Sequence, residues 1–284
     1  MNSVFLFLLT LVFLPATAGA QIGFSVQSDG DDQLYSIDLP SGTATPIGPT
    51  GFNDIECLSF DPSGTILYGV DDNTDQLVTC STSTGACNAV GPLVNLDDGQ
   101  LNCGLTFDCS GNLFLSTEED TPTFYSVNPN TGQATPIGPQ GQDVTGLAAR
   151  KGDVTCFSGV FGLGGEDDEN LGCMDTTTGA FQEIGPLINV SYDGEGGIDF
   201  DSNGVLWGIE DGGTIFTINP ATGLATVVTT TFNSFEGLAI NADTCGTLSR
   251  PIPTLGEWGL IAMSAVLGIA GFMFIYIRRR KITA

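Results

Sequence analysis

The sequence contains no histidine and only seven lysine or arginine residues among its 284. Without an imidazole, the chain lacks the usual general base near neutral pH, the serine–histidine and cysteine–histidine nucleophile pairs, and imidazole metal ligands. Any acid–base chemistry would therefore depend on carboxylates. The scarcity of cations also excludes nucleic acid as a partner. Between Gln21 and Arg250, 32 acidic residues against three basic ones give a net charge of −29, which repels a phosphate backbone.

Charged residues of either sign are few, and the residues that favour helices are correspondingly scarce. Only 14% of the chain is charged, whereas it contains 39 glycines. Frequent glycine, threonine, aspartate and asparagine are typical of many short strands joined by tight turns. The composition predicts an all-β fold.

Long hydrophobic runs are confined to the two ends. The first extends from Val4 to Leu14 and precedes the small residues Ala18-Gly19-Ala20, which predicts a cleavable signal peptide over residues 1–20. The second is an uncharged run of 20 residues, 258–277, which predicts one C-terminal transmembrane helix. A basic cluster after this run predicts a stop-transfer signal on the cytoplasmic side, so that the rest of the chain faces outward. The cluster consists of Arg278, Arg279, Arg280 and Lys281.

A short motif stands directly before the predicted helix. Its residues are Ile252, Pro253, Thr254, Leu255, Glu257 and Trp258. With the hydrophobic run and the basic end, residues 252–284 resemble the IPTL-CTERM sorting domain of Gram-negative bacteria. The resemblance implies a precursor that spans the inner membrane, is processed by an exosortase-type membrane transpeptidase, and then reaches the cell surface or the medium. The alternative is a plain single-span anchor, in which Pro253 only keeps the preceding linker extended.

Two short segments alternate along the rest of the chain, and each occurs five times. One is QLYSIDLPSGTATPIGP and its variants, and the other is CLSFDPSG and its variants. A repeat of about 45 residues that contains four strands is the signature of a β-propeller blade. We predict a five-bladed propeller over residues 21–241 and a linker over 242–251. The pattern resembles NHL-type secreted propellers, in which the GLxFD strand is innermost.

The ends of the repeat region predict how the ring closes. The mature chain begins inside a repeat, at Ile22 to Val26, and the repeat region finishes on a lone inner strand, Gly237 to Ile240. Strands from both termini would then complete one blade and leave the ring without an open edge.

All eight cysteines lie in the exported part, which predicts an oxidising environment and up to four disulfides. Cys80 and Cys87 flank one hairpin turn, and Cys156 and Cys173 are expected on the second and third strands of the fourth blade. We predict these two pairs. The sequence does not indicate how the remaining four cysteines are paired, which are Cys57, Cys103, Cys109 and Cys245. Zinc is the weaker alternative, because no pair has CxxC spacing.

Acidic residues gather on one predicted face of the propeller. On the repeat template, 23 of the 33 acids fall in loops between second and third strands or in crossovers to the next inner strand, which open on the same rim. Clustered carboxylates suit a hard cation such as calcium, which is the cofactor that the sequence predicts. For any single loop, solubility is the leading interpretation, because acidic turn tips are common and no loop has the DxDxDG pattern. The candidate ligands are Asp54, Glu56, Asp193, Glu195 and Glu236. Asp199 differs, because it replaces a small residue on an inner strand and is expected as a channel acid.

Two functions remain open at this point. The first is a non-enzymatic surface or matrix propeller that binds a cation, a polysaccharide or a surface protein, or that has a structural role. The second is a carboxylate enzyme such as a five-bladed glycoside hydrolase, which would place two or three acids around the channel.

Overall fold

The computed structural model describes residues 21–27, 32–94, 96, 102–118, 121–165, 169–192, 194–232 and 235–245. The predicted signal peptide, the sorting motif, the helix 258–277 and the basic cluster lie outside these residues. Within the described part of the chain, no helix is long and apolar enough to cross a membrane.

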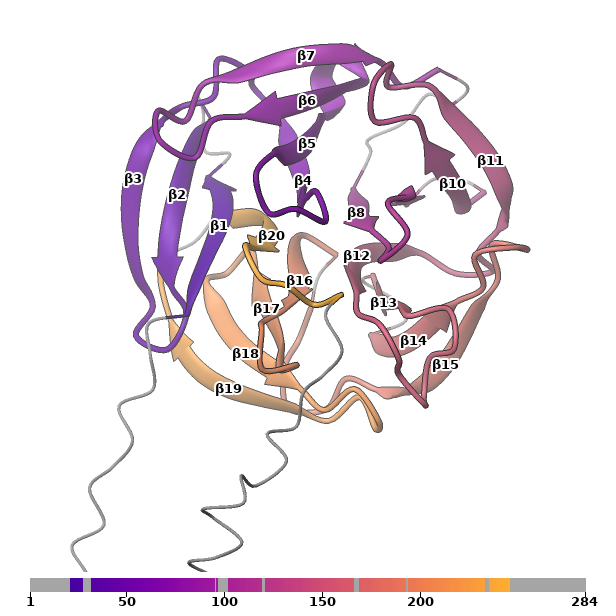
Figure 1. Ribbon diagram of the computed structural model, residues 1–284. Helices are drawn as coiled ribbons and strands as arrows, with labels where there is room; N and C mark the ends of the chain where they lie inside the picture. Colours follow the sequence, from indigo (N-terminus) through magenta and orange to yellow (C-terminus); the bar gives the residue numbers. More distant parts are fainter. Residues whose placement is uncertain are drawn as a thin grey trace, which may run out of the picture. The chain divides into compact units, whose positions relative to one another are not determined.

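The described strands form five antiparallel sheets of four strands each, arranged as blades around an axis (Figure 1). The predicted all-β, five-bladed propeller is confirmed. The innermost strands are β4 (Ile55–Phe60), β8 (Cys103–Phe107), β12 (Val144–Ala149), β16 (Gly196–Phe200) and β20 (Phe235–Ile240). The second strands are β1 (Ile22–Gln27), β5 (Leu67–Asp71), β9 (Leu113–Thr117), β13 (Val160–Gly164) and β17 (Leu206–Glu210).

The third and outer strands complete the blades, and a short 3-10 helix, η1 (Asp72–Thr74), follows β5. The third strands are β2 (Gln33–Asp38), β6 (Gln76–Cys80), β10 (Thr123–Val127), β14 (Asn170–Met174) and β18 (Thr214–Ile218). The outer strands are β3 (Thr43–Pro49), β7 (Cys87–Pro92), β11 (Ala134–Pro139), β15 (Phe181–Pro186) and β19 (Ala225–Thr230).

Burial decreases from the axis to the rim, which explains the composition of each strand type. Second strands such as β9 and β13 are buried at every position and consist mainly of apolar residues. Outer strands such as β19 are mostly exposed and rich in threonine. The apolar core therefore lies between neighbouring blades rather than in one central cluster.

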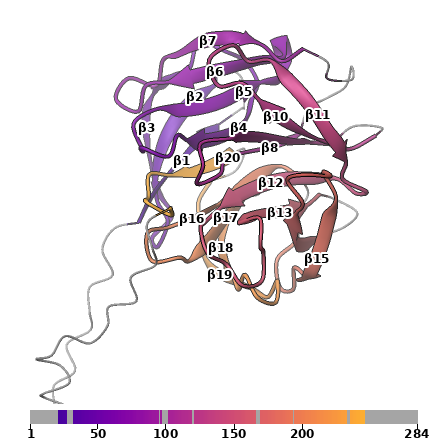
Figure 2. The ribbon, with the colours of Figure 1, turned by 45° about the vertical axis from the view of Figure 1, so that its right-hand side comes forward.

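The ring closes through strands from the two ends of the repeat region. β1 pairs with β20 in antiparallel register, with Gly23 opposite Ile240 and Val26 opposite Glu236. The two strands lie side by side in both views of the molecule (Figures 1 and 2). Ser25 Oγ donates to the carbonyls of Glu236 at 2.9 Å and Gly237 at 2.7 Å. The predicted shared blade is confirmed.

Two glycines of the repeat meet between neighbouring blades. Gly85 lies in the turn between β6 and β7 with a φ of +81°. A Cβ atom at this position would collide with the carbonyl oxygen of Gly48 in β3 of the preceding blade. The same contact recurs between β7 and the turn that contains Gly132. Close blade packing therefore explains why both the TG turn and the IGP strand keep glycine.

Candidate functional site

The central axis is almost filled by side chains. The cavity on the axis measures about 10 Å³ and is lined by all five inner strands, including Leu58, Leu105, Leu147, Ile198 and Leu238. This volume is the room needed for about one water molecule. A sugar ring has no space between the inner strands, so the axis does not offer the substrate channel of a glycoside hydrolase.

Carboxylates meet at one end of the axis. Asp54 precedes β4, Glu56 lies on β4, and Asp72 begins η1 directly after β5. One carboxylate oxygen of each residue lies within 4.8 Å of the others, and all three residues are half-buried. The amide of Asp72 donates to the carbonyl of Asp54 at 2.8 Å, which holds the two loops together. We call Asp54, Glu56 and Asp72 the mouth cluster.

Glu236 extends this cluster from the neighbouring inner strand. Glu236 lies on β20, which packs against β4, and its carboxyl group hydrogen-bonds that of Glu56. Burial raises the pKa of Glu56 far above its usual range, and the charge of Glu236 and their hydrogen bond raise it further. The two carboxyls therefore share a proton at neutral pH when no cation is bound.

Another acid supports the mouth cluster from the first blade. Asp32 is 1% exposed, and its Oδ2 accepts a 2.7 Å hydrogen bond from the amide of Ile55. Because Ile55 is the first residue of β4, Asp32 fixes the position at which this strand begins. The positions of Asp54 and Glu56 on either side of Ile55 are determined by the same contact.

Asp199 lies at the opposite end of the axis. Its two carboxylate oxygens accept hydrogen bonds from the amides of Phe200 at 2.8 Å and Ile240 at 2.7 Å. Burial outweighs these two hydrogen bonds and raises the pKa of Asp199 to about 7. Asp199 lines a cavity of about 30 Å³ together with Ala242, Thr244 and Cys245. Asp199 is therefore a partly buried acid whose two oxygens are both held by backbone amides.

Four disulfides account for all eight cysteines. Cys80 is joined to Cys87 across the β6–β7 turn, and Cys156 is joined to Cys173. Cys173 lies on β14 as expected, but Cys156 lies in the loop before β13 rather than on that strand. The placement of Cys156 on the second strand was wrong, because the β12–β13 connection is longer than a simple turn.

The other two disulfides connect parts of the chain that the repeats alone do not relate. Cys57 is joined to Cys103 between the inner strands β4 and β8. Cys109 is joined to Cys245, 136 residues away, which fastens the segment after β20 to the third blade. Residues 242–245, which we predicted as the beginning of the linker, belong to the compact unit that ends at Cys245.

Comparison with known proteins identifies both parts of the chain. The family model described as "Repeat of unknown function (DUF6923)" matches residues 24–200. The chain belongs to this family. The DUF6923 match begins in β1 and ends with β16, so it covers the repeats up to the inner strand of the fifth blade and leaves β17 to β20 outside. The IPTL-CTERM motif matches residues 250–281, which confirms the resemblance of the tail. This DUF6923 protein is therefore an exported β-propeller protein.

Solved structures share the propeller fold at low sequence identity, whereas no curated protein matches. One is from a nidogen–laminin complex, with a TM-score of 0.51, 14% identity, and coverage of 80% of this chain and 83% of that one. Another is a protein of unknown function from Bacteroides thetaiotaomicron, with a TM-score of 0.51, 18% identity, and coverage of 68% of this chain and 55% of that one. A gluconolactonase from Xanthomonas campestris has a TM-score of 0.49 at 14% identity, with coverage of 77% of this chain and 79% of that one.

The predicted ligands of the DUF6923 propeller have different outcomes. Asp54 and Glu56 lie in the mouth cluster, and Glu236 contacts it through Glu56. Glu195 is half-buried just before β16 and is not a member of the cluster, and Asp193 lies outside the described residues. Asp72 belongs to the cluster but was not among the predicted ligands. In the β4–β5 pair Ile55 lies opposite Asp71, so Asp54 and Asp72 extend from the same end of the pair. Knowledge of this register would have placed Asp72 beside Asp54.

Proposed function

We propose that this exported propeller is a non-enzymatic surface module that binds a divalent cation at the mouth cluster. The observation that supports it is the convergence of Asp54, Glu56 and Asp72 within 4.8 Å. Calcium prefers several carboxylate and carbonyl oxygens with flexible geometry, and water can complete the coordination. The cation would displace the proton shared by Glu56 and Glu236, so its affinity should rise with pH.

The proposed route to the surface rests on the C-terminal tail. The IPTL-CTERM motif implies processing by an exosortase-type system. The precursor would be held in the inner membrane by the predicted helix and then released to the cell surface or the medium. The filled axis disfavours the carboxylate-enzyme alternative, because a substrate could not reach acids between the inner strands.

The cation site is tested by thermal unfolding of the purified full chain in calcium chloride and in sodium chloride at equal ionic strength. General screening of exposed charges depends on ionic strength, whereas coordination depends on the ion. At about 100-fold saturation, a specific site should add roughly 2.7 kcal/mol to the free energy of unfolding. Equal melting temperatures in the two salts would refute the site and leave solubility as the role of these acids.

Glu56→Gln separates binding from stability. The folded wild type keeps the proton of Glu56 that the unfolded chain releases at neutral pH, whereas glutamine is neutral in both states. The melting temperature of this variant without calcium should therefore be higher than that of the wild type, while its calcium response should be lost. Glu183→Gln, at an exposed position on β15, is the matched control and should keep the calcium response. A calcium response that survives in Glu56→Gln would place the bound ion elsewhere.

A further inference from the structure

Two apolar side chains stand in solvent on one loop of the fourth blade. Val154 is 86% exposed and Phe157 is 94% exposed, whereas the other exposed large hydrophobic residues of the described chain range from 38% to 51%. Both lie in the connection between β12 and β13. Antiparallel strands place this connection on the face opposite the mouth cluster. An aromatic ring so exposed costs solvation free energy unless it contacts a partner.

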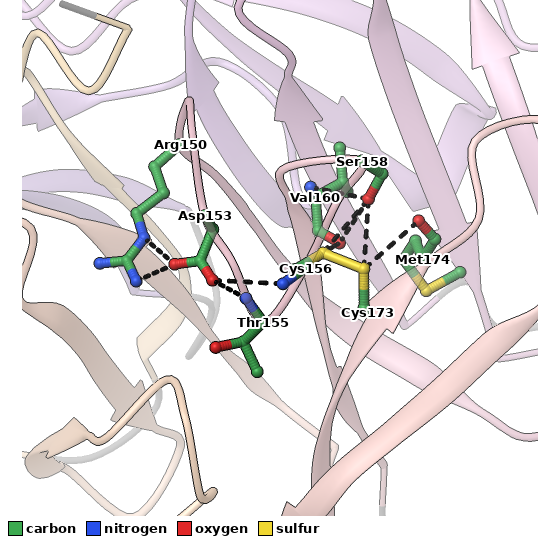
Figure 3. The surroundings of a disulfide bond; sticks show 8 residues. All are labelled: Arg150, Asp153, Thr155, Cys156, Ser158, Val160, Cys173 and Met174. Atoms are coloured by element: carbon green, nitrogen blue, oxygen red, sulfur yellow. Dashed lines mark hydrogen bonds and ion pairs between the residues drawn. A yellow bond between two sulfur atoms is a disulfide. The ribbon is translucent and has the colours of Figure 1, made fainter. Parts of the chain in front are cut away.

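The loop that carries Phe157 is held rigidly. Asp153 forms an ion pair with Arg150, and its Oδ1 accepts hydrogen bonds from the amides of Thr155 at 2.6 Å and Cys156 at 3.2 Å (Figure 3). Ser158 Oγ lies 3.2 Å and 3.3 Å from the two sulfur atoms of the Cys156 disulfide. The conformational entropy of this loop is therefore lost on folding rather than on binding, which favours a preformed site.

Arg150 anchors the same loop to the next blade. Its guanidinium lies 4.5 Å from the ring centroid of Phe200, and its Nη1 donates to the carbonyl of Gly204 at 2.9 Å. The guanidinium is therefore occupied by contacts with the fifth blade. It does not line the neighbouring pocket, so the pocket has no cation to attract an anionic ligand.

A cavity of about 350 Å³ lies beside the loop, and this volume is within the range of small-molecule sites. Its polar lining comes from the β12–β13 loop, the β14–β15 turn and β15. Asp175 Oδ1 in that turn accepts two 2.8 Å hydrogen bonds from the amide and the hydroxyl of Thr177. Gln182 is exposed on β15 and lies opposite Cys173 in the sheet. The lining residues that could contact a ligand through a polar group or an aromatic ring include Thr155, Phe157, Asp175, Thr177 and Gln182.

We propose that this pocket binds a neutral sugar residue of a polysaccharide. A sugar ring has an apolar face of C–H groups, which the Phe157 ring can cover, and an edge of hydroxyls, which Asp175 and Gln182 can bind as acceptor and donor. The lining has a carboxylate and no cation, so phosphate and uronic acid groups are disfavoured. This site goes beyond the proposed cation site and does not depend on it, because the two lie on opposite faces.

The test measures binding of the purified full chain to immobilised dextran, mannan, galactan and xylan by biolayer interferometry, with alginate as the anionic comparison. We expect binding to at least one neutral polysaccharide. Phe157→Ala should weaken it by about tenfold or more, as loss of a central aromatic contact does. Val154→Ala is the matched control, because Val154 shares the loop and its exposure but does not line the pocket, and its affinity should stay within about twofold of the wild type.

Gln182→Leu distinguishes a sugar from an apolar peptide, because it replaces an amide by an apolar group of similar length. A sugar should bind this variant more weakly, and an apolar peptide should bind it more tightly. The proposal is overturned if the wild type binds none of the four neutral polysaccharides or binds alginate best. It is also overturned if Phe157→Ala and Val154→Ala change the affinity for the polysaccharide equally, or if Gln182→Leu binds the polysaccharide more tightly than the wild type does. Thermal melts of the three variants exclude misfolding as the cause.

Discussion

The Oδ2 atom of Asp199 accepts a 2.7 Å hydrogen bond from the amide of Ile240, although the two residues are 41 positions apart. Asp199 lies on β16, the inner strand of the last complete repeat, and Ile240 ends β20, the strand that closes the ring. A partly buried carboxyl group therefore lies at the seam between the fifth blade and the blade shared by both termini. Because this carboxyl has a raised pKa, the seam should respond to pH.

Asp199 should make the protein less stable as pH rises. Its pKa is about 7 in the folded protein and near 3.8 when it is solvated, so between these values the folded state keeps a proton that the unfolded state releases. Over this interval the free energy of unfolding therefore falls by up to about 4 kcal/mol from this group alone, and it levels off above pH 7. Urea unfolding of the full chain at pH 5 and pH 8 measures the difference.

Asp199→Asn is neutral at every pH, so the pH dependence should become flatter. Other acids also titrate, and the comparison with the wild type isolates the part due to Asp199. Glu183→Gln serves as the control and should keep the wild-type profile. An Asp199→Asn profile with the wild-type slope would show that this carboxyl is solvated.

The disulfides should differ in their contribution to stability according to the chain that each encloses. Cys109–Cys245 encloses 136 residues, whereas Cys80–Cys87 encloses seven. In the chain-entropy account, the longer loop contributes about 5 kcal/mol and the shorter about 2.4 kcal/mol. Paired alanine substitutions, measured by denaturant unfolding, should therefore cost roughly twice as much at Cys109 and Cys245. Equal costs would contradict the account in which these disulfides stabilise the fold by restricting the unfolded chain.

Contact between neighbouring blades should make Gly85 more sensitive to substitution than another glycine in the same backbone region. Gly85 and Gly111 have φ values of +81° and +87°. Alanine at either position has a backbone cost of about 1–2 kcal/mol. At position 85 the methyl group also meets the carbonyl of Gly48, whereas at 111 nothing lies within 4 Å. Thermal unfolding should show a further loss of about 1–3 kcal/mol for Gly85→Ala. Equal losses would contradict tight packing at this contact.

The C-terminal motif should be required for processing. We expect that alanine at 252–255 leaves the full precursor in the inner membrane, because the transpeptidase no longer recognises the tail. Mass spectrometry and cell fractionation compare this variant with the wild type. Alanine at 247–249, in the predicted linker, is the control and should be processed normally. Identical mass and location for the wild type and the 252–255 variant would support a plain anchor instead.

The amino-acid sequence by itself determined the architecture, because a propeller blade is specified by local patterns. Each repeat carries its own strand residues, turn glycines and spacing, and these recur five times. The lone strand segments at Ile22 and Gly237 also predicted the closing blade, since a ring with unpaired edges would be unstable. The Cys80–Cys87 disulfide could also be predicted from a local pattern, because its two cysteines flank one turn.

Only the tertiary structure decided which distant side chains meet. The pairing of Glu56 with Glu236 joins opposite ends of the propeller chain, and the disulfide of Cys109 with Cys245 joins its middle to its end. The pocket beside Phe157 is formed by a loop and a turn from different hairpins of one blade. Such contacts depend on the angles between strands and on how far each loop projects. Repeat spacing shows which face a residue occupies, but the distance between two side chains on that face is determined by the packing of the blades.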